Sequence, residues 1–470
     1  MPPQVATIVY TGLILGLFLL DRNRNAHTSK AVWIPVAWLL INGSRPVSAW
    51  LQVGPVMDSP EKYLDGSPLD AAVFAVLLGA GLVVLAGPRR RQVLTILRAN
   101  LPIVLFFAYC ALSILWSDYS FVACKRWIKA TGDLVMVLVV LTETVPSLAI
   151  QRLLTRVAFV LMPASALLIK YYPDLGRSYN VWSWKPEYSG VTTGKNGLGM
   201  ICLVFGLASL WRFLSSYHEP NGKKRTQRLI VHGGIITTAA WLLLTANSMT
   251  SLSCFALAGG LMMVTNVVRQ ARRPVVMHLL VLLVVCVAVS TLFFNVGGGA
   301  LEAMGRDSSL TGRTEIWDIV LRLVHNPLIG TGFESFWLGD RLQTVWDEYV
   351  GTQIQEAHNG YIELYLNLGW IGVILLATLI VTGYRTVMTT FRRDPDIGGL
   401  RLGYFVAAII YSLTEAGFRM MSPIWFAFIL STTALPVAAA QKTLFGVVPR
   451  HANDHLDLSP DPSRREMLNR

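Results

Sequence analysis

The sequence predicts an all-α, polytopic integral membrane protein. Of its 470 residues, 53% are hydrophobic and only 14% are charged, which leaves too little polar surface for a soluble fold. Apolar runs close to the roughly 20 residues that a helix needs to cross a bilayer recur along most of the chain. Because backbone groups inside lipid must find hydrogen bonds within their own segment, we expect these runs to be helices.

The apolar runs predict about 12 or 13 transmembrane helices by the length criterion for a membrane helix. Most of them precede a long hydrophilic insert, and the rest follow it. They lie near Gln4 to Leu20, Ala31 to Ile41, Leu69 to Ala86, Leu101 to Trp116, Gly132 to Val145, Val157 to Tyr172, Gly197 to Ser215, Ile230 to Ala246, Ser251 to Val268, Val275 to Phe294, Tyr361 to Gly383, Leu402 to Leu413 and Ile424 to Ala440. The expected organisation is therefore N-terminal helices over 1–295, an extracytoplasmic loop over 296–358, C-terminal helices over 359–440 and a cytoplasmic tail over 441–470.

Basic residues cluster in every second short loop, which is the pattern that sets membrane orientation. The clusters are Arg22 and Arg24; Arg89, Arg90 and Arg91; Arg152 and Arg156; Lys223, Lys224 and Arg225; Arg269, Arg272 and Arg273; and Arg392 and Arg393. We expect these loops to be cytoplasmic and the segments 42–67, 173–193 and 297–357 to lie outside. The net charge of +12 is thus explained by orientation in a lipid bilayer, and we expect no nucleic-acid partner.

One loop departs from this alternation. Ser117 to Ala130 should lie outside, yet it carries Lys125, Arg126 and Lys129. It is either an exception to the rule or a functional basic face, since cations on an outer surface disfavour insertion in that orientation.

The first span has no basic region before it, so we interpret it as a retained anchor with its N-terminus outside. The cysteines lie in or beside apolar runs without CxxC spacing, and they predict neither a metal site nor a disulfide framework.

The long insert contains a predicted amphipathic helix of about three turns. Its apolar residues follow the i, i+3, i+4 spacing of one helical face, namely Ile316, Ile319, Val320, Leu323 and Val324. Arg313 and Trp317 share another face, and Ser308, Ser309 and Thr311 are suitable caps. By composition alone, this could be a helix that lies on the bilayer surface.

The motifs around this helix resemble a known family. TGRTEIW, then HNPLIGTGFESFW, then AHNGYIELYLNLGWIG before a span resemble the diagnostic region of the O-antigen ligase and polymerase superfamily. The superfamily includes lipopolysaccharide O-antigen ligases, Wzy-type polysaccharide polymerases, exopolysaccharide polymerases and bacterial O-linked oligosaccharyltransferases. TTGKNGLGM resembles a further family element, so the likeness extends from Val191 to Glu415. Where many relatives carry His, this chain has Gly194, and only Lys195 and Asn196 carry over.

The resemblance implies glycosyl transfer at the periplasmic face of a bacterial inner membrane. The donor would be a polyprenyl-diphosphate-linked glycan, and the acceptor a hydroxyl on a glycan, lipid A core or another molecule, with other polysaccharide-assembly proteins as further partners. The reaction would be inverting, metal-independent and free of cofactors. A diphosphate leaving group needs cations, and an Arg fork can bind phosphate oxygens in two places. The candidates are Arg313, Lys195 and Arg177.

The acceptor hydroxyl must lose a proton, and histidine is suited to accept it. We predict His358 as the general base and Glu415 as the group that orients it or the acceptor, while His325 fits a structural turn. Trp317 and Asn196 complete the predicted substrate contacts together with two residues at the start of the helix after His358. These two are Asn359 and Glu363, which share a polar stripe with Asn367. The stripe serves either the substrate or interhelical hydrogen bonding.

Several alternatives stay open at this point. Glu415 and Arg419 could form an ion pair, and the aromatic segment Tyr171 to Trp184 could be an interfacial belt or a sugar-stacking surface. No P-loop or dinucleotide fingerprint is present. The competing function is a transporter or flippase for lipid-linked oligosaccharides, which should place its decisive polar residues near the bilayer midplane.

Overall fold

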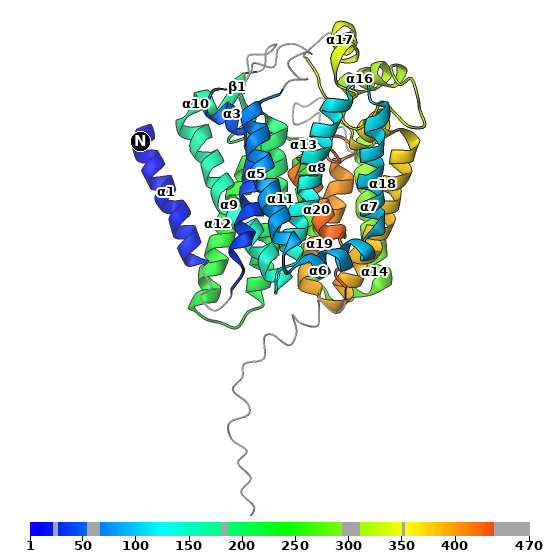
Figure 1. Cartoon of the computed structure of the whole chain (residues 1–470). Helices are drawn as coiled ribbons and strands as arrows, with labels where there is room; N and C mark the ends of the chain where they lie inside the picture. Colours follow the sequence, from blue (N-terminus) through cyan, green and yellow to red (C-terminus); the bar gives the residue numbers. More distant parts are fainter. Residues whose placement is uncertain (22–26, 54–65, 180–185, 294–310, 350–352, 437–470) are drawn as a thin grey trace, which may run out of the picture.

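The computed structural model describes residues 1–21, 27–53, 66–179, 186–293, 311–349 and 353–436. These residues form a bundle of helices that run along a common direction, with short elements at its two ends (Figure 1). Seven of the described helices are long and apolar enough to cross a membrane, or eight if one bent pair counts as a single span. The seven are α1 (Pro3–Leu20), α5 (Pro68–Ala86), α9 (Pro146–Tyr171), α11 (Lys195–Tyr217), α12 (Lys223–Ala246), α13 (Met249–Val267) and α18 (Gly360–Arg393). The predicted all-α membrane fold is confirmed.

Each predicted span falls on a helix, but several of these helices are shorter than a full span. The predicted spans outside the seven long helices fall on α2 (Trp33–Asn42), α7 (Leu101–Leu112), α8 (Ser120–Leu141), α14 (Pro274–Phe293), α19 (Pro395–Tyr411) and α20 (Pro423–Thr432). Short 3-10 turns adjoin three of them: Lys30–Val32 precedes α2, Ser113–Trp116 follows α7 and Arg269–Arg272 precedes α14. Every residue of α20 is buried, so this helix is apolar because it lies inside the protein. The predicted end of the last span, 437–440, and the tail over 441–470 lie outside the described residues.

The predicted boundary of α8 is wrong. The helix begins at Ser120, so most of the loop expected at 117–130 is helical and its three cations lie on the first turns of a helix. Long basic side chains can keep their charged ends in a polar region while their stems lie along an apolar surface. The apolar run alone therefore marked only the second half of this helix.

The two ends of the bundle differ in charge. At one end, α16 (Thr311–Arg322) and α17 (Gly339–Glu348) lie together with α3 (Val47–Trp50), α10 (Pro173–Gly176) and the two-stranded antiparallel sheet of β1 (Arg177–Tyr179) and β2 (Pro186–Tyr188) (Figure 1). We call this the insert end. At the opposite end lies α6 (Arg90–Ala99), which is bent by 91° from the helix that follows it. Because α18 starts at the insert end, its last residues Arg392 and Arg393 also reach the opposite end, which we call the basic end.

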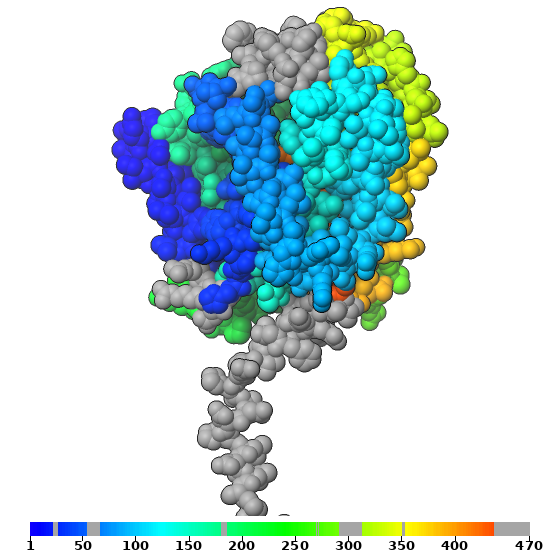
Figure 2. All heavy atoms as spheres, in the orientation of Figure 1, coloured from blue at the N-terminus to red at the C-terminus, as the bar shows by residue number. Residues whose placement is uncertain are grey.

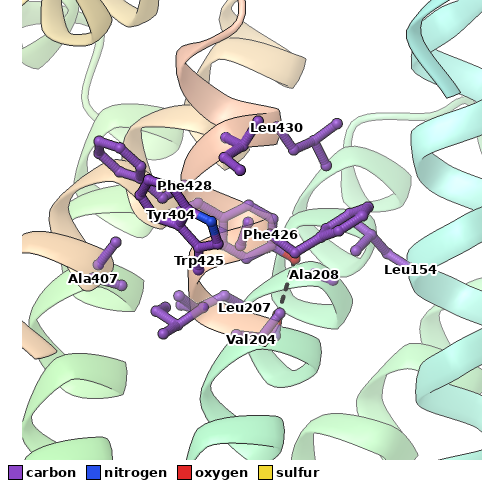
Figure 3. Close-up of a cluster of buried hydrophobic side chains, with 14 of the residues drawn as sticks. Leu154, Val204, Leu207, Ala208, Tyr404, Ala407, Trp425, Phe426, Phe428 and Leu430 are labelled. Atoms are coloured by element: carbon purple, nitrogen blue, oxygen red, sulfur yellow. Dashed lines mark hydrogen bonds between the residues drawn. The ribbon is translucent and has the colours of Figure 1, made fainter. Parts of the chain in front are cut away.

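Most of the described helices pack inside the bundle, whereas α1 lies at its edge and exposes most of its surface (Figures 1 and 2). One cluster of buried apolar side chains comes from α9, α11, α19 and α20 (Figure 3). There, the hydroxyl of Tyr404 donates a 3.0 Å hydrogen bond to the carbonyl of Val204, and the rings of Trp425 and Phe428 stack with centroids 5.5 Å apart. The buried phenol thereby satisfies its polar group inside an apolar core.

A break in α18 is the main irregularity of the bundle. Gly369 has φ 62° and ψ −164°, which interrupts the helical hydrogen bonds. In lipid, freed backbone groups must find partners within the protein. The segment 326–332 supplies them on both sides of the break: Thr331 and Gly332 donate to the carbonyls of Leu366 and Asn367, and the carbonyls of Pro327 and Leu328 accept from Trp370 and Ile371.

The HNPLIGTG motif therefore pairs the backbone groups that this break leaves free. The side-chain oxygen of Asn326 accepts from the backbone N–H groups of Leu328 and Ile329 at 3.0 and 3.3 Å, which fixes the turn. His325, next to this turn, is exposed. Its position at the turn agrees with the structural role predicted for it.

The amphipathic helix predicted in the insert is present as α16. Its apolar residues Ile316, Ile319 and Val320 pack into a second hydrophobic cluster with residues of α17, the chain before α18 and Leu366. The apolar face therefore faces the protein itself, which argues against a helix that merely lies on the bilayer surface. The predicted caps Ser308 and Ser309 lie outside the described residues, and Thr311 is the first residue of the helix.

We expect Gly369→Ala to destabilise the protein. A Cβ atom here would lie 2.3 Å from the carbonyl carbon of Leu328, and φ would stay in the left-handed region. Strain of this kind costs about 1–3 kcal/mol, so the thermal unfolding midpoint of the detergent-solubilised protein should fall. Gly79→Ala is the matched control, because no heavy atom lies within 4 Å of its Cβ position. Equal melting of both variants and the wild type would contradict this account of the break.

Candidate functional site

Four predicted residues from distant parts of the sequence meet at the insert end. Asn196 lies in the first turn of α11, Arg313 in the first turn of α16, His358 directly before the start of α18, and Glu415 in the loop between α19 and α20. Each therefore lies at or near the end of a helix, where side chains can leave the bundle. We call these four residues the Glu415 cluster.

The carboxylate of Glu415 is the common partner of the other three. Its Oε1 lies 3.0 Å from Nη2 of Arg313, and its Oε2 accepts from Nδ2 of Asn196 at 3.1 Å and lies 3.3 Å from Nδ1 of His358. The side chain of Glu415 is only 5% exposed, whereas that of Arg313 is 26% exposed. A nearly buried carboxylate thus holds a guanidinium and an imidazole that are both still accessible.

His358 is constrained by its backbone as well as by its contacts. Its φ of 47° lies in the left-handed region, where non-glycine residues are uncommon and often mark functional positions. Nδ1 also lies 3.1 Å from Oε1 of Glu356. Both carboxylates therefore contact the same ring nitrogen, Nδ1.

The pKa of His358 is strongly affected by this surrounding. Burial by itself lowers the pKa, but the hydrogen bonds and charges of Glu356 and Glu415 outweigh it and raise the pKa from 6.5 to about 10. For Glu356, burial raises the pKa, but the hydrogen bond and charge of His358, with the charges of Arg419 and Arg313, lower it overall. At neutral pH the side chain of His358 is thus an imidazolium, which must lose its proton before it can act as a base.

The predicted ion pair between Glu415 and Arg419 is wrong. Nε of Arg419 lies 3.5 Å from Oε2 of Glu334, and its Nη1 lies 3.8 Å from Oε2 of Glu356. The charges alternate along one chain of contacts from Arg313 through Glu415, His358, Glu356 and Arg419 to Glu334. Helical spacing suggested the pair, but the backbone between Glu415 and Arg419 is a loop, so residues four apart do not share a face.

Two comparisons with known proteins found matches, and one of them covers the part of the chain that carries Arg313 and His358. Residues 233–377, which include Arg313 and His358, match the family model described as O-Antigen ligase. The chain is also 26% identical over 321 residues to the exopolysaccharide production protein ExoQ of Rhizobium meliloti (strain 1021), which covers 65% of this chain and 70% of that protein. Both matches support the O-antigen ligase and polymerase superfamily, which the motifs of the sequence also resemble. This family indicates a ligase- or polymerase-type enzyme of polysaccharide assembly in the membrane.

Two of the predicted cations, Lys195 and Arg177, lie apart from the Glu415 cluster. Nζ of Lys195 forms a 2.8 Å ion pair with Glu187 of β2. Arg177 donates through Nε and Nη2 to the carbonyl of Ile169 and stacks on the ring of Tyr188. Arg177 is therefore occupied by the fold, whereas Lys195 is adjacent in sequence to Asn196 and half exposed. Of the aromatic segment, Trp182 and Trp184 lie outside the described residues.

The polar stripe of the superfamily's AHNGYIELYLN motif is used by the fold. The side-chain oxygen of Asn359 caps α18 by accepting from Tyr361 and Ile362. The carboxylate of Glu363 accepts from Nε1 of Trp337 at 2.7 and 2.8 Å. These contacts support the structural interpretation of the stripe over substrate binding by Asn359 and Glu363.

Trp317 and Asn367 tie the insert to the helix that carries His358. Nε1 of Trp317 donates a 2.7 Å hydrogen bond to the carbonyl of Ala357, the residue before His358. Oδ1 of Asn367 accepts from the backbone N–H groups of Ser335 and Phe336. Trp317 therefore lies at the cluster, and its contact fixes the backbone that presents His358.

A small cavity of about 30 Å³ lies beside the cluster. Its walls come from α7, α8, α18, α20 and the loop residues Phe333, Glu334, Phe418 and Arg419. Because Glu334 and Arg419 also belong to the chain of alternating charges, the cavity is connected to the Glu415 cluster through these two residues.

Two residues that the sequence analysis did not single out contribute to the site. Glu356 lies two positions before His358, and Glu334 lies in the GFESF stretch with φ 50°. A carboxylate so close to the proposed base was a usable signal for Glu356. No sequence spacing could have indicated that Glu334 and Glu356 both pair with Arg419.

Two members of the Glu415 cluster, His358 and Glu415, form a set of metal-ligating groups together with Glu356. Glu356, His358 and Glu415 offer ligand atoms that all lie within 4.8 Å of one another. However, Arg313 already binds Glu415 and Arg419 lies against Glu356, so a divalent cation would have to compete with two guanidinium groups. The donor set therefore fits a metal poorly, and the arginines supply the positive charge.

The contacts of His358 should contribute pH-dependent stability. Since the pKa is raised from 6.5 to about 10 in the folded protein, this contribution is full below pH 6.5 and is lost as the pH rises through about 10. We expect the difference in thermal midpoint between the wild type and His358→Gln to shrink across this interval. A difference that stays constant from pH 6.5 to 10 would show that the imidazolium is not stabilised by its carboxylates.

Proposed function

We propose that the protein is a membrane glycosyltransferase that transfers or polymerises glycan from a polyprenyl-diphosphate-linked donor to a hydroxyl acceptor. The convergence of Arg313 and His358 on the single carboxylate of Glu415 carries this proposal. It places a cation suited to a diphosphate and a group suited to proton transfer within one cluster. Transfer would be a single inverting displacement that needs no metal.

Arg313 would stabilise the leaving group. As the acceptor oxygen forms its bond to the anomeric carbon, the bond from that carbon to the diphosphate breaks and the electron pair moves onto the diphosphate. A partly desolvated guanidinium stabilises this charge, and its planar fork matches two phosphate oxygens. In the resting cluster, Glu415 occupies the position beside Arg313 that a phosphate would take. Lys195 would contribute in the same way after release from Glu187.

His358 would accept the proton of the acceptor hydroxyl at Nε2. The carboxylates of Glu356 and Glu415 hold Nδ1, so the ring is oriented and the imidazolium that forms is stabilised. Once the diphosphate binds Arg313, Glu415 becomes free to pair more closely with the imidazolium. Glu415 thereby couples departure of the leaving group to proton transfer.

We infer that the insert end faces the extracytoplasmic side of a bacterial inner membrane. The described basic clusters on α6 and at the end of α18 lie at the opposite end, and positive charges favour the cytoplasmic face. The donor would therefore be used after it has crossed the membrane, and other polysaccharide-assembly proteins would supply it.

Between polymerase and ligase, the polymerase is favoured. The similarity to an exopolysaccharide production protein supports transfer to a growing glycan rather than to lipid A core. A transporter or flippase for the same lipids is disfavoured, because the polar residues of the Glu415 cluster gather at one end of the bundle and not near its middle. Product analysis would separate chain lengthening from transfer to lipid A core.

Arg313→Ala and His358→Ala should each reduce turnover by at least about 100-fold, the effect of removing one transition-state donor or base. The assay follows release of polyprenyl diphosphate by the purified protein in the presence of a chelator. Arg322→Ala is the control, since this residue lies on the same helix, is 64% exposed and pairs with Glu348. Unchanged turnover in both site variants, with unchanged melting, would contradict the assignment.

The pH dependence of turnover should identify the form of His358 that acts. If its neutral form is the base, log kcat/KM rises with pH between 6.5 and about 10, because deprotonation populates the base. Activity that falls across this interval would show that the imidazolium itself is required. The slope should disappear in the residual activity of His358→Gln.

A further inference from the structure

The basic face of α8 takes no part in the function proposed above. It consists of Lys125, Arg126 and Lys129, which lie within the first three turns of a helix that starts at the insert end. If that end is extracytoplasmic, these three cations oppose the orientation preference of the other loops. A feature that opposes insertion needs a compensating interaction.

The basic face lies next to the candidate site. Arg126 donates through Nη1 to the backbone carbonyl of Glu334, whose carboxylate pairs with Arg419. Arg126 and Lys129 are three residues apart and therefore share one face of the helix. A ligand on this face would thus lie beside Arg126, which contacts Glu334 at the end of the chain of charges that leads to His358.

The nearby carboxylates do not neutralise the two lysines. In the described part of the chain, no carboxylate lies within ion-pair distance of Lys125 or Lys129, and the carboxylate of Glu334 pairs with Arg419. Asp70 is also held by the backbone and hydroxyl of Ser48. Nζ of Lys125 lies 4.8 Å from the ring of Phe121, which is 77% exposed. The face therefore keeps a net positive charge.

The surface around this face is hollowed. α5 and α7 both pack against α8, and Figure 2 shows a recess between α5 and α7 where α8 runs. On α8 itself, the apolar side chain of Ile128 is 45% exposed between Lys125 and Lys129. Cations and exposed apolar side chains alternate here at the insert end of the bundle, which is the arrangement that suits a phosphate attached to a hydrocarbon chain.

We propose that the basic face of α8, in the recess between α5 and α7, is a second binding site for a lipid-borne phosphate. Lys125 and Lys129 contact the phosphate oxygens, Arg126 holds the loop of Glu334 in place beside them, and the hydrocarbon chain lies along the recess. The ligand is either a polyprenyl phosphate or diphosphate, which rests on the proposed function, or an anionic phospholipid of the bilayer.

Binding of defined lipids to the purified full-length protein tests the proposal. The probes are undecaprenyl phosphate, phosphatidylglycerol and undecaprenol, which lacks the phosphate, each measured by native mass spectrometry at two salt concentrations. The variant K125Q/K129Q should bind the phosphate lipids about 30-fold more weakly, because each of the two Lys contributes about a fivefold gain in affinity for an anionic lipid. K223Q/K224Q, at the start of α12 at the basic end, is the matched control and should bind as the wild type does.

Each outcome decides the proposal. Preference for undecaprenyl phosphate over phosphatidylglycerol assigns the site to a polyprenyl-linked substrate. Equal binding of these two lipids assigns it to phospholipids of the bilayer, and both outcomes support a lipid-phosphate site. Wild-type affinity in K125Q/K129Q, or equal binding of undecaprenol, overturns it. Arg126 is left unchanged because its contact with Glu334 is structural.

Failure of this inference can be distinguished from failure of the proposed function. Loss of lipid-phosphate binding in K125Q/K129Q would support the site even if no turnover were found with any donor. Normal turnover that depends on Arg313 and His358, together with unaffected lipid binding in K125Q/K129Q, would overturn the second site alone.

Discussion

The break in α18 at Gly369 is the constraint on which the arrangement of the site depends. Backbone groups freed in the middle of a membrane helix must be paired within the protein. The segment 326–332 pairs them, and this fixes the insert against α18. Because the insert carries Arg313 and the start of α18 carries His358, one set of backbone hydrogen bonds sets the relative position of the two motifs. Asn367 and Trp317 then add side-chain contacts to the same junction.

Charge compensation is the second principle of the site. Removing a charge from water is costly unless a partner of opposite sign is close. Here carboxylates and cations alternate from Arg313 to Glu334, so each charged group contacts at least one group of opposite sign. Such a chain can exchange one partner for another without leaving a charge unpaired. In the proposed reaction, a phosphate would replace Glu415 beside Arg313 while Glu415 retains its contact with His358.

The same chain of contacts reaches across the insert end to α8. Glu334, with its left-handed backbone, connects Arg419 to the carbonyl contact of Arg126. The candidate site and the basic face of α8 are therefore parts of one charged surface layer above an apolar bundle. Inside the bundle, apolar side chains of α9, α11, α19 and α20 pack together (Figure 3).

The sequence by itself determined the membrane class, the positions of most helices and the amphipathic helix of the insert, because hydropathy and helical periodicity are local properties. Its motifs also gave the resemblance to the superfamily. It also indicated Asn196, Arg313, His358 and Glu415 through motifs. Only the tertiary structure decided that the other three share the carboxylate of Glu415, that Arg419 pairs with Glu334 and Glu356, and that Asn359 caps α18 while Glu363 accepts from Trp337. Contacts between segments far apart in the chain depend on how helices pack and where loops turn, and no local spacing encodes them. The start of α8 was missed for a related reason: its first turns are polar, and their helical state depends on the insert and loops that pack around them.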